Sequence, residues 1–176
     1  MSHRIPLQDC LSDEHLAGIG LIVAEWAHVE QLLKMALCNL MDDSPAGSTR
    51  TRLFWVVTGM DVRATIGLIK TLTRIKISSE EQLTRLDKIL DGIERLKQWR
   101  DIVAHATWHK GDRAGTIKPF GIKAVGKVKS LKGEVSARAL RAMAYVIYRY
   151  GTHLVGFFQD HGLMKRNETE RQSTGD

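Results

Sequence analysis

The sequence predicts a mainly α-helical protein: an antiparallel four-helix bundle with a small β-hairpin or meander inserted before the last helix. Two observations carry this prediction. Apolar residues recur at steps of three and four along several long stretches, which is the period of an amphipathic helix. Ahead of the last such stretch lies a segment rich in glycine, lysine and β-branched residues. That composition is typical of short strands and turns.

The first helix is expected from Asp13 to Met41, with Ser12 or Asp13 as its cap and a break at Pro45 and Gly47. Its predicted core stripe consists of Leu16, Ile19, Val23, Trp26, Val29, Leu33, Ala36 and Leu40. A second helical region covers about 51–76 in two pieces, with a break at Gly59. Its LFWVV segment fits a strand by periodicity alone, but the short link to the amphipathic stretch behind it favours a helix.

The third long helix is expected to begin at Ser78 or Ser79, where SSEEQ offers capping boxes, and to end near Ala104 or His105. Short strands are predicted at 108–109, 116–123 and 127–129 around a KGDRAG turn. The last helix starts after Ser136. Residues 1–12 are an expected N-terminal extension, 13–163 the bundle domain with its hairpin at about 106–130, and 164–176 a disordered tail without an apolar stripe.

The composition is that of an ordinary globular domain. The chain has 176 residues, of which 43% are hydrophobic and 26% charged, enough for one domain with its own core. No secretory signal is found at the N-terminus, and the longest apolar run, Leu16 to Ala24, is too short to cross a bilayer. Cys10 and Cys38 form no CxxC pair, and no residues follow a metal-ligand spacing. We therefore expect a cytoplasmic protein that needs neither a membrane, nor a cofactor, nor a metal.

Positive charge is concentrated in one segment. From His105 to Glu134, seven basic residues stand against two acidic ones, which leaves a net +5 in a chain whose total is +6. Such a segment is the electrostatic footprint expected for a phosphate backbone, and we select Lys110, Arg113, Lys123, Lys127 and Lys129 as candidate nucleic-acid ligands. The alternative is a solvated lysine-rich loop without a ligand.

The most informative stretch is LKQWRDIVAHATW, which contains Arg100, Asp101 and His105. Arg100 continues the apolar stripe of the third helix, so it is expected in a buried seam, where a charge needs an anion. His105 falls at the helix end. Arginine binds phosphate bidentately, and histidine moves protons near neutral pH, so the pair suits attack on a phosphodiester.

RDIVAH resembles the R-x4-6-H motif of the HEPN superfamily, in which a polar residue usually follows the arginine. IVAEWAHVEQLL in the first helix, HATW after the motif and the basic GKVK hairpin are similar to bacterial and phage members, over roughly Leu16 to Phe158. The resemblance implies a helical bundle that often dimerises. It also implies metal-independent endoribonuclease activity, with the motif residues of both protomers lining one cleft.

The expected function is thus an RNA-cleaving enzyme of a toxin–antitoxin or defence system, which leaves 2′,3′-cyclic phosphate ends. Arg100 would stabilise the phosphorane, Asp101 would orient His105, and an antitoxin or regulatory protein would be a partner. A C2 homodimer is expected to bring two Arg100–His105 pairs to a shared groove. The alternative is a non-catalytic helical dimer that binds a protein or a nucleotide.

Structural roles stay open for each of these residues. Arg100 pairs with a buried acid in the alternative interpretation, and Glu30 beside the first-helix stripe is the natural candidate. His105 caps the helix C-terminus, where a cation is favoured. Asp101 orients the His105 ring or is merely solvated. Trp108 is expected to pack under the hairpin rather than to stack a base.

Overall fold

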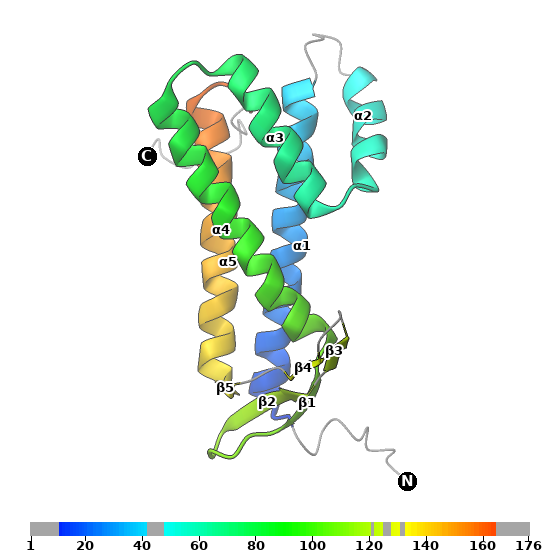
Figure 1. Ribbon diagram of the computed structural model, residues 1–176, viewed down its shortest axis with the longest axis vertical. Coiled ribbons are helices and arrows are strands. Elements are labelled where there is room, and N and C mark those ends of the chain that lie inside the picture. The colour runs from blue at the N-terminus through cyan, green and yellow to red at the C-terminus, as the bar shows by residue number, and fades with distance from the viewer. Residues whose placement is uncertain (1–10, 42–47, 121, 125–127, 131–132, 165–176) are drawn as a thin grey trace, which may run out of the picture. The chain divides into compact units, whose positions relative to one another are not determined.

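The structure, a computed structural model, describes residues 11–41, 48–120, 122–124, 128–130 and 133–164 (Figure 1). Over these residues the protein is mainly helical, with a small three-stranded antiparallel sheet. The helices are α1 (Asp13–Met41), α2 (Ser48–Thr58), α3 (Val62–Lys76), α4 (Glu80–His105) and α5 (Ala137–Asp160). The strands are β1 (Thr107–Lys110), β2 (Thr116–Phe120), β3 (Ile122–Ala124), β4 (Val128–Ser130) and β5 (Val135–Ser136).

The chain divides into two compact units. Unit 1 comprises residues 1–29 and 93–149, and unit 2 comprises residues 30–92 and 150–176. Each of the three long helices, α1, α4 and α5, is therefore divided between the two units, with one segment in each. The sheet and the candidate residues Arg100, Asp101 and His105 belong to unit 1, whereas Glu30 belongs to unit 2.

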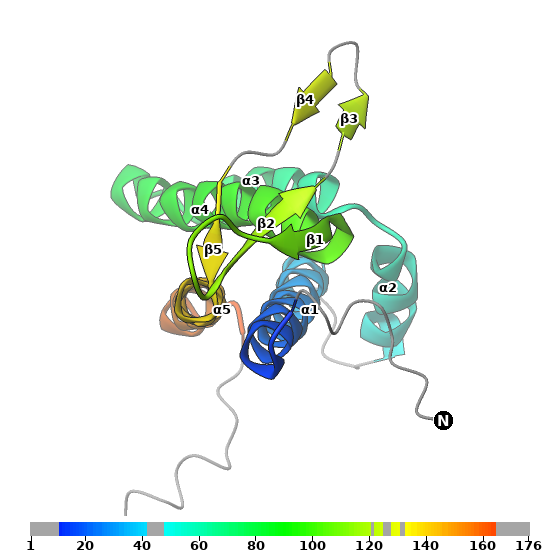
Figure 2. The same cartoon turned by 90° about the horizontal axis from the view of Figure 1, so that it is seen from below.

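Unit 1 packs one face of its sheet toward the helices. The sheet order is β1-β2-β5, with Thr107 opposite Phe120 and Ile117 opposite Val135. Trp108 and Ile117 point inward and are buried, and the Trp108 indole donates from Nε1 to the Val103 carbonyl at 3.3 Å. In Figure 1, β1 and β2 lie where α4 ends and α5 begins, and Figure 2 shows the strands from that end.

Close helix packing in unit 1 depends on a glycine. A Cβ at Gly18 of α1 would lie 2.8 Å from the Leu140 Cβ of α5, so a larger residue would push these helices apart. The core of the unit is completed by Ile22, Trp26, Ile93, Ala144 and Ile147, all nearly inaccessible to solvent.

Unit 2 combines an apolar core with an ion-pair network between α3 and α4. Phe157 and Phe158 of α5 meet edge to face at 5.8 Å and are fully buried. At the surface, Lys70 Nζ lies 2.6 Å from Asp91 Oδ1, and Arg74 Nη2 lies 2.8 Å from Asp87 Oδ2. Each of these partly exposed ion pairs contributes little to stability. Burial of apolar side chains in the core therefore contributes most of the stability of this unit.

Most predicted helix bounds are confirmed. The first helix runs from Asp13 to Met41, the second region splits into α2 and α3 around Gly59, and LFWVV is helical. Ser79 and Ser136 each accept a backbone N–H from the first turn of the helix that follows them, as caps do.

Two details of the prediction are wrong. The expected strand 116–123 is divided into β2 and β3, and β3 pairs with β4 in a separate two-stranded sheet. In the predicted core stripe, Leu16 and Val23 are 40% and 44% exposed, while Ile22 and His15 are buried. Between Leu16 and Ala27 the helix is apolar nearly all round, so its periodicity does not determine which face is buried.

Some predictions fall on residues outside the described ranges. These are the break at Pro45 and Gly47, Cys10, Lys127, most of the N-terminal extension 1–12 and the tail beyond Met164. By length and composition alone, α1 is apolar enough to cross a membrane, and 33% of its most apolar window is buried inside the protein. The core helix of a soluble protein meets the same criterion.

Candidate functional site

Arg100 is held in place by an aromatic ring and a carboxylate. Its guanidinium carbon lies 5.5 Å from the centroid of the Trp26 ring of α1, within the range of a cation–π contact. Its Nη1 donates to Asp101 Oδ1 at 3.1 Å, and the side chain is 23% exposed. Arg100 therefore lies in a partly buried seam, and Trp26 supplies the surface against which the arginine rests.

Asp101 lies between two basic side chains. Lys97, one helical turn earlier, donates from Nζ to Asp101 Oδ2 at 2.8 Å. Partial burial opposes ionisation of Asp101, but the hydrogen bond from Lys97 and the charges of Lys97, Arg100 and His105 outweigh it. Together they hold the pKa of the Asp101 carboxyl below its usual value. Asp101 is thus an anion at neutral pH, and it can orient a histidine but cannot act as a general acid.

His105 is the last residue of α4, and its side chain is exposed. Residues four apart share one face of a helix, so His105 lies on the Asp101 side of α4. Five residues rotate the helix by about 140°, so Arg100 and His105 start from different faces. Asp101 accepts hydrogen bonds from Lys97 and Arg100, and the charge of His105 contributes to the lowered pKa of its carboxyl.

A dense hydrogen-bonded clasp closes the turn between β1 and β2. The Glu134 carboxylate accepts from Thr116 Oγ1 at 2.7 Å, from the Asp112 amide at 2.7 Å and from Arg113 Nε at 3.0 Å. The hydrogen bond from Thr116, followed by those from Asp112 and Arg113, lowers the pKa of Glu134 to about 2. Arg113, a predicted nucleic-acid ligand, therefore already has a carboxylate partner, although its side chain is 75% exposed.

The remaining predicted phosphate ligands are distributed over two sheets. Lys110 is exposed on the edge strand β1. Lys123 and Lys129 are Cα partners in the antiparallel pair β3–β4, and Lys127 lies outside the described residues. The register thus brings these two lysine positions together at the level of the backbone.

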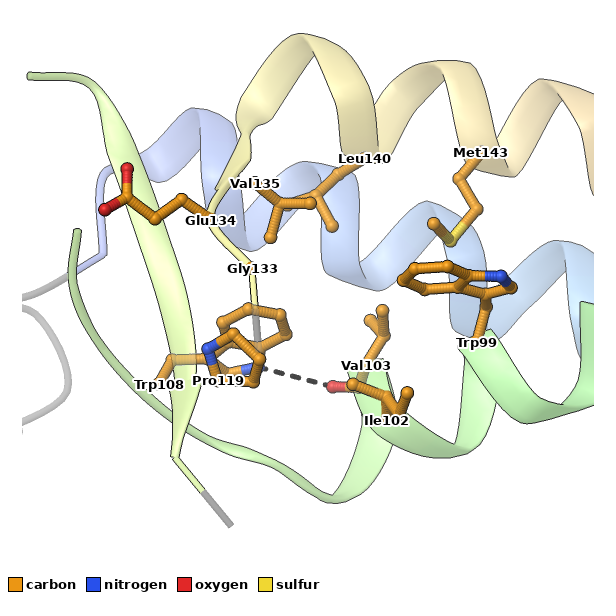
Figure 3. A pocket seen from close by; sticks show the side chains of 10 residues that line it. All are labelled: Trp99, Ile102, Val103, Trp108, Pro119, Gly133, Glu134, Val135, Leu140 and Met143. Atoms are coloured by element: carbon orange, nitrogen blue, oxygen red, sulfur yellow. Dashed lines mark hydrogen bonds between the residues drawn. The ribbon is translucent and has the colours of Figure 1, made fainter. Parts of the chain in front are cut away.

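A pocket of about 150 Å³ lies on the side of α4 opposite to Asp101 and His105 (Figure 3). Trp99, Ile102 and Val103 of α4 line it together with Trp108, Pro119, Gly133, Glu134, Val135, Leu140 and Met143. Figure 3 shows the Glu134 carboxylate directed away from the cavity, and the Trp108 N–H is already bonded to Val103. Without polar groups aimed into it, this small apolar space lacks what fixes the orientation of a substrate.

The other candidates have structural positions. Trp108 is buried, as expected for packing under the hairpin. Glu30 is half-buried on the unit 2 segment of α1. Cys38 is a buried free thiol. Among the described residues, no group of three or more His, Cys, Asp or Glu side chains is placed to hold a metal ion.

The chain matches no protein-family model, no curated protein and no solved structure. Its function is therefore inferred from its own residues.

Sequence reasoning missed three contributors to this region. Lys97 stands four residues before Asp101, a helical spacing that is readable from the sequence. Phe120 falls in the polar register of TIKPF, because Ile117 and Pro119 alternate with Lys118 and Phe120. The Trp26–Arg100 contact joins residues far apart in the sequence, and no local pattern indicates it.

Proposed function

We propose that this protein is a cytoplasmic, metal-independent endoribonuclease of the HEPN type, built on an antiparallel four-helix bundle. The observation that carries the proposal is the arrangement at the end of α4. An arginine held by Trp26 and Asp101 lies five residues before an exposed histidine, and the basic sheet region follows directly.

In this proposal the chemistry needs only groups of the chain, the RNA and water. His105 takes the proton of a ribose 2′-hydroxyl while water protonates the leaving 5′-oxygen, or His105 protonates the 5′-oxygen while water takes the 2′-hydroxyl proton. The 2′-oxygen attacks the adjacent phosphorus and the bond to the 5′-oxygen breaks, which yields a 2′,3′-cyclic phosphate and a 5′-hydroxyl. Arg100 stabilises the charge on the phosphorane, and the anionic Asp101 orients the histidine.

The first experiment is incubation of the purified protein with mixed RNA in EDTA. We expect cleavage that leaves 2′,3′-cyclic phosphate ends, because the 2′-hydroxyl nucleophile requires no metal-bound water. Single-stranded DNA of the same sequence, which lacks this hydroxyl, is the matched control and should stay intact. Cleavage that stops in EDTA, or that proceeds equally on DNA, would contradict the mechanism.

Arg100→Lys tests the arginine itself. Lysine keeps the positive charge but loses the planar fork that binds phosphate bidentately. We expect the cleavage rate to fall by about 100-fold or more, as when one donor to a developing charge is removed. Thermal unfolding of the variant is followed in parallel. Full activity in the folded fraction together with a lowered melting temperature would make Arg100 a purely structural residue.

A specific observation supports the expected homodimer, and it also favours the alternative function, a non-catalytic interaction protein. Seven exposed apolar residues form what we call the α1 outer face: Leu16, Ala17, Gly20, Leu21, Val23, Ala24 and Ala27. No charged residue interrupts them from Leu16 to Ala27 except the half-buried Glu25. Contiguous exposed apolar surface of this kind marks interaction sites.

The charges at the two ends of this face fit a second copy of the chain. Asp13 and Glu14 stand exposed at its N-terminal end and His28 at its C-terminal end. A parallel pairing of two α1 helices would oppose like acids, whereas an antiparallel two-fold pairing places the acids of one copy near His28 of the other. The small residues Ala17, Gly20 and Ala24 permit close approach of the helix axes. We therefore propose an antiparallel C2 dimer across this face.

The homodimer, a regulatory protein and RNA are thus the proposed partners. If the purified protein forms this dimer but cleaves no RNA under any condition, the non-catalytic dimer that binds a protein or nucleotide becomes the better description.

A further inference from the structure

The two faces of the β1–β2 pair differ in chemistry. Successive side chains of a strand point to opposite sides, and residues paired across strands point to the same side. The register therefore places Trp108, Ile117 and Pro119 on the inner face, together with the exposed Lys110 at the end of β1. Thr107, His109, Lys118 and Phe120 fall on the other side, which we call the outer sheet face. The inner face is part of the unit 1 core, whereas the outer sheet face is directed to solvent.

Phe120 is the conspicuous residue of the outer sheet face. Its side chain is 63% exposed, although a phenyl ring gains free energy from burial. The packing of unit 1 leaves it uncovered on a strand whose neighbouring residues Ile117 and Pro119 turn toward the core. A single exposed apolar residue is common on protein surfaces, so exposure alone identifies no site.

A contact with the His109 ring gives the exposed Phe120 ring a defined geometry. The His109 and Phe120 rings lie diagonally across the strand pair, with centroids 5.1 Å apart and planes inclined by 65°. Because the rings meet edge to face, they do not stack on each other. Such a pair leaves an aromatic face to which a third flat ring can add, at a position fixed by the sheet.

The charges near this pair select the kind of flat ring. Phe120 leads into β3, whose Lys123 stands opposite Lys129 of β4, and the segment from His105 to Glu134 has a net charge of +5. Single-stranded nucleic acids are bound by this combination of stacking aromatic residues and basic residues along the backbone. An apolar peptide or a lipid chain would gain nothing from the lysines.

We propose that the outer sheet face is a stacking platform for an unpaired base of single-stranded RNA, with Phe120 and His109 as its aromatic residues. The choice of RNA rests on the proposed function; the stacking itself does not. β1 begins two residues after His105, and His109 lies at most about 14 Å of extended chain from it. A base on the platform would therefore position a neighbouring phosphodiester near the end of α4.

The test measures binding separately from cleavage. Fluorescence anisotropy with a short single-stranded RNA is carried out in the His105→Ala background, so that the probe survives. Phe120→Ala removes one stacked aromatic residue and should weaken RNA binding about 5- to 150-fold. Phe120→Trp should bind as well as the parent or more tightly. Phe120→Leu, which keeps apolar volume but has no ring, should behave like Phe120→Ala.

Matched controls separate stacking from general effects. Trp55→Ala removes an aromatic side chain that is 72% exposed on α2, an element of unit 2 that is not part of the sheet, and should leave RNA affinity unchanged. The melting temperature of Phe120→Ala should hardly move, because the ring is exposed. The loss of affinity should be similar at low and high salt, because stacking releases no counterions. Duplex RNA, whose bases are already stacked, should bind equally to parent and Phe120→Ala.

The outcomes distinguish this inference from the proposed function. If parent protein cleaves RNA while Phe120→Ala changes neither the dissociation constant nor KM, the platform is wrong and the nuclease stands. If nothing is cleaved but Phe120→Ala weakens binding of single-stranded RNA, the platform stands and the nuclease falls. Equal affinities of the Phe120→Ala and Phe120→Leu variants with the parent, or no binding of single-stranded RNA by the parent, would overturn the platform.

Discussion

The α1 outer face and the outer sheet face are both exposed surfaces of unit 1, yet they suit different partners. The α1 outer face consists of aliphatic and small side chains with charges only at its ends, so its favourable contact is another apolar surface. The outer sheet face has one exposed phenyl ring, one imidazole and a lysine, beside a segment rich in positive charge. Exposure alone thus predicts little, whereas the chemistry that surrounds an exposed apolar residue distinguishes a protein partner from a nucleic acid.

The variant with the largest expected effect tests whether RNA is cleaved at the end of unit 1 that carries the sheet. His105→Ala should lower the cleavage rate by about 10² to 10⁴, the usual contribution of a general acid or base. The imidazole is exposed, so the helical signal should remain. Single-turnover rates on a defined RNA measure the loss.

A matched control for this variant is His153→Ala, which removes another exposed histidine on the unit 2 segment of α5. It should cleave like the parent. If His105→Ala also cleaves normally and only melts earlier, the histidine serves as a helix cap, whose loss costs about 1 kcal/mol.

The second prediction tests whether the α1 outer face forms the dimer interface. Leu21→Glu places one carboxylate from each copy near the centre of the proposed two-fold interface. Like charges brought together there cost several kcal/mol, so the dimer should dissociate about 100-fold more readily. Sedimentation or light scattering as a function of concentration measures the constant.

Ala142→Glu, on the exposed face of α5, adds the same charge outside the interface and should leave the dimer intact.

His28→Asp should weaken the antiparallel dimer, and His28→Lys should strengthen it. A parent mass near that of one chain, 19.8 kDa, at all micromolar concentrations would exclude self-association across this face. Binding of the parent to liposomes, abolished by Leu21→Glu, would assign the face to a membrane surface instead.

The third prediction concerns the lysine-rich hairpin. Replacing Lys123, Lys127 and Lys129 by Gln should weaken RNA binding and make it less sensitive to salt. Three lost phosphate contacts reduce the slope of log K against log salt by about 2 for a single strand. This result would contrast with Phe120→Ala, which should lower the affinity without changing the slope. An unaltered slope would identify the segment as a solvated loop.

The smallest expected effect concerns the Glu134 clasp. A carboxyl whose folded pKa of about 2 lies below its ordinary value stabilises the folded state when it is ionised. This stabilisation is complete above the ordinary pKa of glutamate and disappears as pH falls toward 2. Glu134→Gln should therefore melt below the parent at pH 7, and the two proteins should converge as pH is lowered from about 4.5 to 2.

The matched control for the clasp is Glu80→Gln, which removes an exposed carboxylate from the first turn of α4, outside the turn between β1 and β2. Its melting temperature should stay close to that of the parent across the pH range, because surface substitutions change stability little. Parallel melting curves for Glu134→Gln and parent across the whole range would mean that the clasp adds no stability.

Much of the helical architecture was predictable from local sequence. Caps such as Ser79 and Ser136, the break at Gly59 and the three-to-four period act within a few residues, so they locate helix ends without knowledge of the fold. The position of Arg100 and His105 at the end of a long helix followed from the same signals. The division of the predicted strand 116–123 into two did not, because strand pairing depends on partners distant in sequence.

The candidate site was predictable in its residues but not in its contacts. RDIVAH indicated Arg100, Asp101 and His105, and helical spacing relates Lys97 to Asp101. That Arg100 lies over Trp26 depends on how α4 packs against α1 within unit 1, and no spacing in either helix determines this.

The sequence by itself determined the helices, their caps, the charge of the 105–134 segment and the order of the motif residues, because each depends on neighbours along the chain. Tertiary structure alone decided which side of α1 faces the core, leaving Leu16 and Val23 exposed. This segment has apolar residues on nearly all sides, so its periodicity permits more than one burial. Packing against distant residues selects one of them, and it leaves the other side exposed.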